Sequence, residues 1–119
     1  MTDGMEAVFP LIFARGAYLE LLDFPQPIIK AAGYELHKVQ HGRKPTDSKP
    51  IVGLVGAISG VFEIRLSHEG NEYRVIYVPG LARSVYVLHC FQKKRRSTPR
   101  QALALTTQRY KEILHLIHA

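Results

Sequence analysis

Two runs of alternating side chains, separated by a four-residue turn, constrain the fold of this chain more than any other feature. Residues 61–67 (VFEIRLS) and 72–78 (EYRVIYV) have the alternation of half-buried strands, and residues 68–71, which include Gly70, join them. The expected cross-strand pairs are Ser67–Glu72, Leu66–Tyr73, Arg65–Arg74 and Ile64–Val75. This register collects apolar side chains on one face of a hairpin and sets two arginines side by side on the other face, which we expect to be uncovered.

The paired arginines admit two interpretations. In the functional one, Arg65 and Arg74 clamp a phosphate, because a guanidinium offers a planar fork for oxyanions and two adjacent cations need a counter-anion. In the structural one, Glu63 lies on the same face and neutralises them, so that the arginines are merely solvated. The sequence leaves both interpretations open.

Proline, glycine and apolar spacing predict the other elements. Pro10 limits the first strand to an edge or a bulge, and Gly42 supplies a stop for the second helix. The expected elements, in chain order, are a strand over 7–13, helices over 15–22 and 27–40, a loop over 42–51, an irregular stretch over 53–60, strands over 61–67, 72–78 and 84–91, and a helix from residue 98 to near the end. This order, β-α-α-β-β-β-α with a small antiparallel sheet packed by helices, predicts one α+β domain over residues 1–119.

Positive charge is concentrated in the last third of the chain. The formal net charge is +6, and from Arg83 onward eight Lys/Arg residues stand against one Asp/Glu, whereas the earlier part has eight against nine. This asymmetry indicates a polyanionic partner. The basic residues at the end of the sheet, which we expect to contact nucleic acid, are Lys93, Lys94, Arg95, Arg96 and Arg100. A solvated basic run is the alternative interpretation.

Other chemical motifs are few. His89 shares strand parity, and therefore one predicted face, with Val85, Val87 and Phe91, which favours a packed histidine over a catalytic one. His115 and His118 lie three residues apart on the last predicted helix but lack an evident third ligand, so we expect no metal site. The chain contains no P-loop, dinucleotide-binding glycine fingerprint, HExxH or GxSxG motif, and we expect no cofactor.

The single cysteine and the absence of long apolar runs bear on location. Cys90 is alone, which excludes an internal disulfide, favours a reducing compartment and is typical of a small buried residue. No apolar run approaches the roughly 18–20 residues that span a bilayer, and residues 1–6 lack the basic charge of a secretory signal. We therefore expect a cytoplasmic protein without a membrane partner.

Several segments resemble a known family. The most specific are YRVIY at 73–77 and VYVLHCFQKK at 85–94, with Thr98 and Pro99 after them. The upstream segments that fit are FP at 24–25, GYEL at 33–36 and QHG at 40–42. From about residue 8 to residue 110, the chain resembles the phage-related branch of the RelE/ParE toxin superfamily, close to the HigB-type toxins.

The resemblance implies the toxin of a type II toxin–antitoxin pair with a RelE-like fold. Many relatives are ribosome-dependent endoribonucleases that cut mRNA without a metal, using the substrate 2′-hydroxyl to attack its own 3′ phosphate. The implied partners are the ribosome, mRNA and a cognate antitoxin, expected to be a helix-turn-helix DNA-binding protein that forms an oligomer with the toxin.

Carried over by position, the resemblance places Arg74 at the hairpin arginine of the ribonucleolytic members, with Arg65 and Arg96 near two further basic positions. His89 is a candidate acid or base. Glu63 stands where some relatives have another lysine, and Tyr110 is a loose counterpart of a C-terminal tyrosine. We therefore expect an mRNA endoribonuclease. Two alternatives stay open, a non-enzymatic ParE-like poison of DNA gyrase and a phage-derived binding protein without toxicity.

Overall fold

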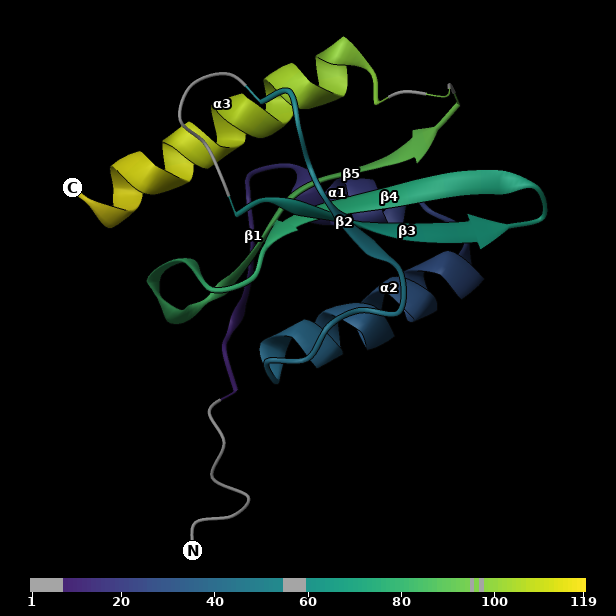
Figure 1. The fold of residues 1–119 in the computed structure, drawn as a ribbon, viewed down its shortest axis with the longest axis horizontal. Coiled ribbons are helices and arrows are strands. Elements are labelled where there is room, and N and C mark those ends of the chain that lie inside the picture. The colour runs from purple at the N-terminus through teal and green to yellow at the C-terminus, as the bar shows by residue number, and fades with distance from the viewer. Residues whose placement is uncertain (1–7, 55–59, 95, 97) are drawn as a thin grey trace, which may run out of the picture.

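The computed structural model describes residues 8–54, 60–94, 96 and 98–119. In chain order its elements are β1 (Leu11–Phe13), α1 (Ala17–Leu22), α2 (Gln26–Gln40), β2 (Ser48–Pro50), β3 (Phe62–His68), β4 (Asn71–Val78), the 3-10 turn η1 (Leu81–Arg83), β5 (Val85–Lys93) and α3 (Arg100–Ile117). The predicted α+β class and the order of the main elements are confirmed (Figure 1).

The strands form one mixed sheet in the order β1-β5-β4-β3-β2. The strand β1 lies at an edge, as Pro10 predicts, and pairs parallel with β5, while the other pairs are antiparallel. The prediction of a loop over residues 42–51 is wrong for its last part, because Ser48–Pro50 forms the edge strand β2, which pairs with β3. A strand of three residues that contains a proline has almost no sequence signal, and only the neighbouring β3 makes it a strand.

The hairpin register is the one that the sequence predicts. The observed pairs include Ser67–Glu72, Leu66–Tyr73, Arg65–Arg74 and Ile64–Val75. The apolar face is buried, with both Ile64 and Val75 at 0% exposure, α2 in contact with β3, and the ring of Phe24, between α1 and α2, 5.0 Å from that of Tyr73. Alternation fixes the register because a slip of one residue would turn this apolar set to the other face.

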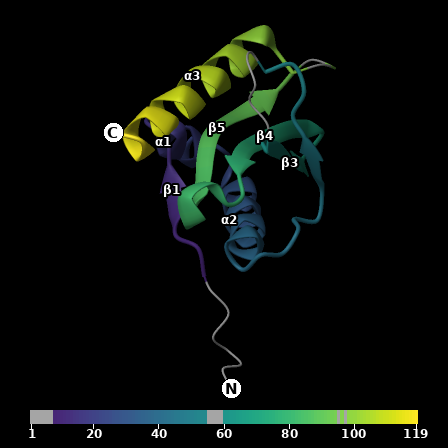
Figure 2. The same cartoon turned by 60° about the vertical axis from the view of Figure 1, so that its left-hand side comes forward.

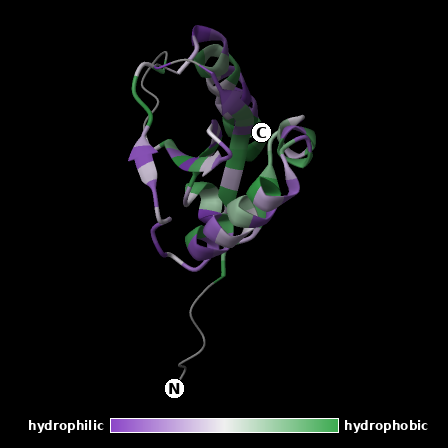
Figure 3. Cartoon of the chain, turned by 90° about the vertical axis from the view of Figure 1, so that its right-hand side faces the viewer, coloured by the Kyte–Doolittle hydropathy of each residue, from purple (hydrophilic) through white to green (hydrophobic). Residues whose placement is uncertain are grey.

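Helices cover both sides of the sheet. The views in Figures 1 and 2 both place α2 on one side and α3 on the other, with α1 close to β5. The two long helices, α2 and α3, each carry apolar and polar residues on different sides, which gives them mixed colours in Figure 3. In the described part of the chain, no helix has the length and apolar character needed to cross a membrane.

A bulge in β5 changes which side chains share a face. Ile76 pairs with His89, but the next residue of β4, Tyr77, pairs with Val87, so Leu88 is an extra residue in β5. The prediction that His89 and Val87 share one face of the strand is therefore wrong. The bulge turns His89 to the face that carries Arg74 and Ile76, whereas Val87 stays with Tyr77.

Candidate functional site

Arg74 lies at the centre of the charged face of the hairpin, and it is buried. The residue is 3% exposed, Nη1 lies 3.2 Å from Glu72 Oε1, and Nε lies 3.7 Å from Glu63 Oε1. Nη1 also donates a hydrogen bond to the Tyr73 carbonyl oxygen, at 3.0 Å. The prediction that this face is uncovered is wrong at Arg74, because Glu63, at 8% exposure, and Ile76, at 0%, are buried beside it.

Of the two carboxylates around Arg74, Glu72 is itself held by hydrogen bonds. Hydrogen bonds from Ser67 and Arg74 lower the pKa of Glu72 below its ordinary value. The interpretation in which Glu63 neutralises the arginines is thus confirmed for Arg74. Yet neither Arg74 Nε nor Glu63 Oε1 has a hydrogen-bond partner among the described residues, so the pair keeps unused hydrogen-bonding capacity.

Arg65 faces Arg74 across the strands but lies in a more open environment. Its side chain is 30% exposed, and Nε is 3.7 Å from the exposed carboxylate of Asp47. This contact is weak, because 3.7 Å is too long for a hydrogen bond and Asp47 is exposed to solvent, although Arg65 Nε itself is buried without a hydrogen-bond partner among the described residues. Of the two predicted clamp arginines, only Arg65 presents its side chain to solvent in this conformation.

The far end of the sheet carries the predicted basic residues. Lys93 pairs with Glu72 across β4 and β5, and the unbroken register from there to Arg74 puts Lys93 on the charged face. Lys94 and Arg96 are exposed after the strand, and Arg100, also exposed, begins α3. Arg95 lies outside the described residues. The structure thus brings Lys93 next to the arginine pair, whereas Lys94, Arg96 and Arg100 lie in the connection to α3.

His89 belongs to a separate, partly buried cluster that the sequence did not reveal. Its Nδ1 lies 2.9 Å from Glu20 Oε1, and Arg109 donates to both oxygens of Glu20, at 2.8 and 3.0 Å. Burial opposes ionisation of Glu20, but the hydrogen bonds from His89, Arg109 and the Cys90 amide outweigh it and lower the pKa of Glu20 to about 2. Because an ionised carboxylate only accepts hydrogen bonds, Nδ1 of His89 carries the proton.

The same cluster closes the edge of β5 where β1 has ended. Glu20 accepts a hydrogen bond from the Cys90 amide at 3.1 Å, and Arg109 donates to the Leu88 carbonyl oxygen at 2.9 Å. Gly16 leaves the space for this arrangement, since a Cβ there would lie 2.7 Å from Arg109 Nη2. No local pattern links Glu20 to Arg109, which are 89 residues apart, so the sequence held no usable signal for the pair.

The remaining candidate residues are Cys90, His115 and His118. Cys90 is buried, as predicted, and burial raises the pKa of its thiol above the ordinary value. His115 and His118 lie at the exposed end of α3. Over residues 8–54, 60–94, 96 and 98–119, no group of three or more His, Cys, Asp or Glu side chains is arranged to hold a metal ion.

Comparison with known proteins gives one result. The model of the family described as phage derived protein Gp49-like (DUF891) matches residues 19–111. The chain belongs to the Gp49-like family. This is a phage-derived family of RelE/ParE-like toxins, and the mixed five-stranded sheet with three helices is compatible with a RelE-like fold. No curated protein and no solved structure matches the chain.

The part that matches the Gp49-like family includes both groups of charged residues. It runs from α1, where Glu20 lies, through the hairpin with Arg65 and Arg74, to Arg109 on α3. The strand β1 lies before the matched part. The matched part therefore contains the charged face of the sheet and, apart from β1, the strands and helices that support it.

Proposed function

We propose that this Gp49-like chain is the toxin of a type II toxin–antitoxin pair and cuts mRNA at the ribosome as an endoribonuclease close to the HigB-type toxins. The observation that carries the proposal is the common sheet face of Arg65, Arg74 and Lys93, next to the exposed Lys94 and Arg96. Guanidinium and ammonium groups at the end of a sheet suit a chain of phosphates.

Each arginine has a different task in this proposal. Arg65, which is partly exposed and weakly paired, contacts the scissile phosphate and stabilises the charge that develops on it. Arg74, which Glu63 and Glu72 neutralise in this conformation, supports the face from beneath and gains an oxyanion contact only if the Glu63 contact opens. Lys93, Lys94, Arg95, Arg96 and Arg100 hold the flanking phosphates.

The cleavage step needs proton transfers as well as charge stabilisation. The 2′-hydroxyl loses a proton as it attacks the adjacent phosphorus, and the leaving 5′ oxygen gains one. His89 is our candidate for one transfer, because Glu20 holds Nδ1 and leaves Nε2 to accept or give the proton. The carboxylate thus acts as a positioning residue and the imidazole as the acid or base.

A non-enzymatic gyrase poison resembling ParE is the second candidate. The observation in its favour is that Arg74 forms ion pairs with Glu63 and Glu72. The face therefore has fewer free cations than a complete ribonuclease site would have. A binding protein without toxicity is the third candidate. The nuclease, the gyrase poison and the non-toxic binding protein each predict a different effect on the cell.

Inducible expression in a host that lacks the neighbouring genes separates these candidates. A ribosome-dependent nuclease generates new mRNA 5′ ends confined to translated codons, and Arg65→Ala removes those ends while Lys30→Ala, an exposed change on α2, keeps them. Intact messages together with trapped, cleaved DNA would support the gyrase poison. Normal growth without either lesion would overturn the toxin proposal.

The proposed partners follow from the same surface. A cognate antitoxin, which we propose to be a small helix-turn-helix DNA-binding protein, neutralises the toxin with an acidic or amphipathic segment that covers the basic end of the sheet. The proposed location is the cytoplasm, where ribosomes and mRNA are found. Co-expression of the neighbouring reading frame should yield a stable complex and restore growth.

A further inference from the structure

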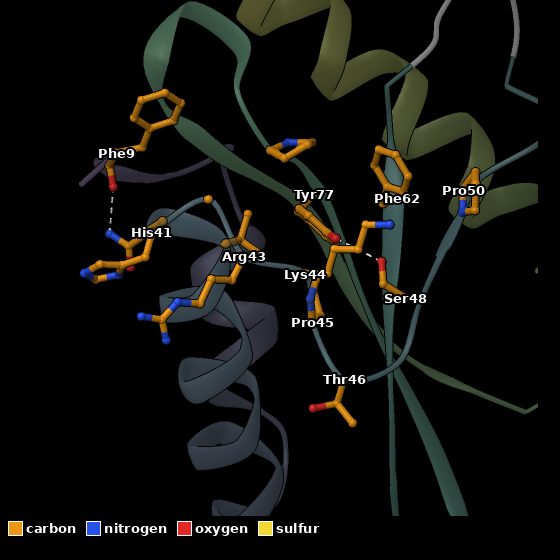
Figure 4. Close-up of a pocket in the computed structure, with 14 residues that line it drawn as sticks. Phe9, His41, Arg43, Lys44, Pro45, Thr46, Ser48, Pro50, Phe62 and Tyr77 are labelled. Atoms are coloured by element: carbon orange, nitrogen blue, oxygen red, sulfur yellow. Dashed lines mark hydrogen bonds between the residues drawn. The ribbon is translucent and has the colours of Figure 1, made fainter. Parts of the chain in front are cut away.

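A concave site lies away from the arginine face, beyond the C-terminal end of α2. It is a pocket of about 720 Å³ between the segment before β1, the loop after α2 and the ends of β3 and β4 (Figure 4). The rings of Phe9, Phe62 and Tyr77 form its apolar walls. This volume is in the range of small-molecule sites, which are about 300–1,000 Å³ and mostly apolar with a few polar groups.

The walls of the pocket are fixed before any ligand arrives. Phe9 exchanges two hydrogen bonds with Gln40, from its amide to the Gln40 carbonyl and from Gln40 Nε2 to its own carbonyl, each at 2.9 Å. On the opposite wall the Ser48 and Tyr77 hydroxyl groups are 2.9 Å apart, and the Phe62 and Tyr77 rings lie 6.0 Å apart, centre to centre. The aromatic surface is therefore preorganised.

The polar lining of the pocket is positive. His41, Arg43 and Lys44 line it, and no described lining residue is acidic. Figure 4 shows Arg43 and Lys44 extending in different directions from one loop. The nearby Glu35 carboxylate is held by the lining residue Thr46, whose amide and hydroxyl donate to it at 2.8 and 2.9 Å, and it is paired with Lys38 at 3.3 Å.

The simplest alternative role for these cations is to neutralise the end of α2, whose carbonyl groups carry partial negative charge. The backbone already satisfies those carbonyls. The amide of Gly42, at φ +76°, donates to the Val39 carbonyl at 3.0 Å, and the amide of Arg43 donates to the Lys38 carbonyl at 2.9 Å, which is a Schellman motif. The side chains of Arg43 and Lys44 form no ion pair with any described residue, so they remain available.

We propose that this pocket binds a nucleotide, with the base against Phe62 and Tyr77 and the phosphate at Arg43 and Lys44. Aromatic side chains stack on any base. Figure 4 shows Arg43 and Lys44 extending in different directions from the loop, so either cation can turn toward a phosphate on its own side. The nucleotide is either a free mononucleotide or one residue of an RNA strand. The proposal does not depend on cleavage activity, because it concerns binding at a different part of the surface.

The test is calorimetric titration of the purified full chain with the four ribonucleoside 5′-monophosphates, the corresponding nucleosides, inorganic phosphate and a short oligoribonucleotide. At least one mononucleotide or the oligonucleotide should bind saturably, and at least about tenfold more tightly than a nucleoside or phosphate alone. Saturable binding of a mononucleotide identifies a free-nucleotide site. Binding of the oligonucleotide alone identifies an RNA contact.

Matched variants locate the binding. The double change Arg43→Ala with Lys44→Ala should weaken binding at least about tenfold, because both proposed phosphate ligands are lost. Lys30→Ala with Lys111→Ala removes the same charge from exposed positions outside the pocket and should leave affinity unchanged. Circular dichroism checks that both variants fold. Equal affinity in the two double variants, equal binding of phosphate and nucleotide, or no saturable binding would each overturn the proposal.

Discussion

Arg65 and Arg74 have the same chemistry and adjacent positions, yet the fold gives them different roles. The Arg74 guanidinium is 4% exposed between two carboxylates, whereas the Arg65 side chain is 30% exposed beside one exposed carboxylate. A buried ion pair is sensitive to the loss of one partner, because the remaining charge stays out of water. An exposed pair contributes little to stability.

We therefore expect the two arginines to differ when each is replaced by alanine. Arg74→Ala should lower the free energy of unfolding by about 3–5 kcal/mol, since the Glu63 carboxylate would be left buried without its cation. Arg65→Ala should change it by at most about 1 kcal/mol. Urea unfolding followed by circular dichroism measures both. Adding Glu63→Gln to Arg74→Ala should recover part of the loss, and equal losses in the two single variants would refute this account.

Ionisation of Glu20 makes the free energy of unfolding depend on pH in the acid range. Its pKa is about 2 in the folded chain and 4.5 in an ordinary environment, so the folded state binds its proton less readily than the unfolded state does. A depressed pKa gives stability that is fully present above pH 4.5 and is lost as the pH falls toward 2.

The variant Glu20→Gln should lose part of this pH dependence. Wild type should be more stable than Glu20→Gln at pH 6, and the difference should shrink steadily from pH 4.5 to pH 2, where the carboxylate becomes protonated. Melting temperatures over this range measure the effect. Glu69→Gln, at an exposed turn position, is the control and should follow wild type. A difference that stays constant down to pH 2 would mean that the Glu20 carboxylate is not responsible.

At the scale of elements, the end of α2 sets the position of the loop that carries Arg43 and Lys44. The Schellman hydrogen bonds turn the chain at Gly42, and Glu35 then holds Thr46 two residues beyond that basic pair. Two glycines in and after α2 allow this account to be tested. Gly33 lies inside the helix with open space around an added Cβ, whereas Gly42 has a positive φ.

Alanine at these two glycines should have opposite effects. Gly42→Ala should destabilise the chain by about 1–2 kcal/mol, because an L-residue pays for the left-handed conformation. Gly33→Ala should stabilise it by about 0.5–1 kcal/mol, because alanine loses less backbone entropy in a helix. Thermal unfolding of both variants measures the shifts. A destabilising Gly33→Ala would mean that the α2 surface has a packing partner that the open space does not suggest.

At the scale of the whole molecule, charge is separated along the sheet. The helices α1 and α2 together carry two acidic and two basic residues, whereas β5 and α3 with their connection carry seven Lys/Arg residues against one Glu. Such a separation orients a polyanion toward one end of the molecule before any specific contact forms.

RNA affinity should therefore depend on salt through the residues at that end. Lys93→Ala with Lys94→Ala should reduce the slope of log affinity against log salt concentration by about 1–2 units, since each phosphate contact on a single strand contributes about 0.7–1. Filter binding or fluorescence anisotropy at several salt concentrations measures the slope. Arg15→Ala with Lys30→Ala removes the same net charge from exposed positions outside β5, α3 and their connection, and an equal reduction in that variant would show that only the total charge matters.

Local patterns by themselves determined the hairpin register, the edge position of β1, the end of α2 at Gly42 and the α+β order of elements. Each depends on residues close in sequence, because strand alternation, glycine at positive φ and proline geometry act over a few positions. For the candidate site, alternation was enough to pair Arg65 with Arg74, and local composition was enough to identify the basic residues from Lys93 onward.

Only the tertiary structure decided what surrounds those residues. Packing buried Arg74 with Glu63, placed the β5 bulge that turns His89 to the sheet face of Arg74, paired β2 with β3, and joined Glu20 to Arg109 across 89 residues. These contacts depend on which elements the folded core brings together, and no short-range periodicity encodes that choice. The sequence could therefore name the charged residues of this Gp49-like chain, but the fold decided which of them meet a counter-ion and which face solvent.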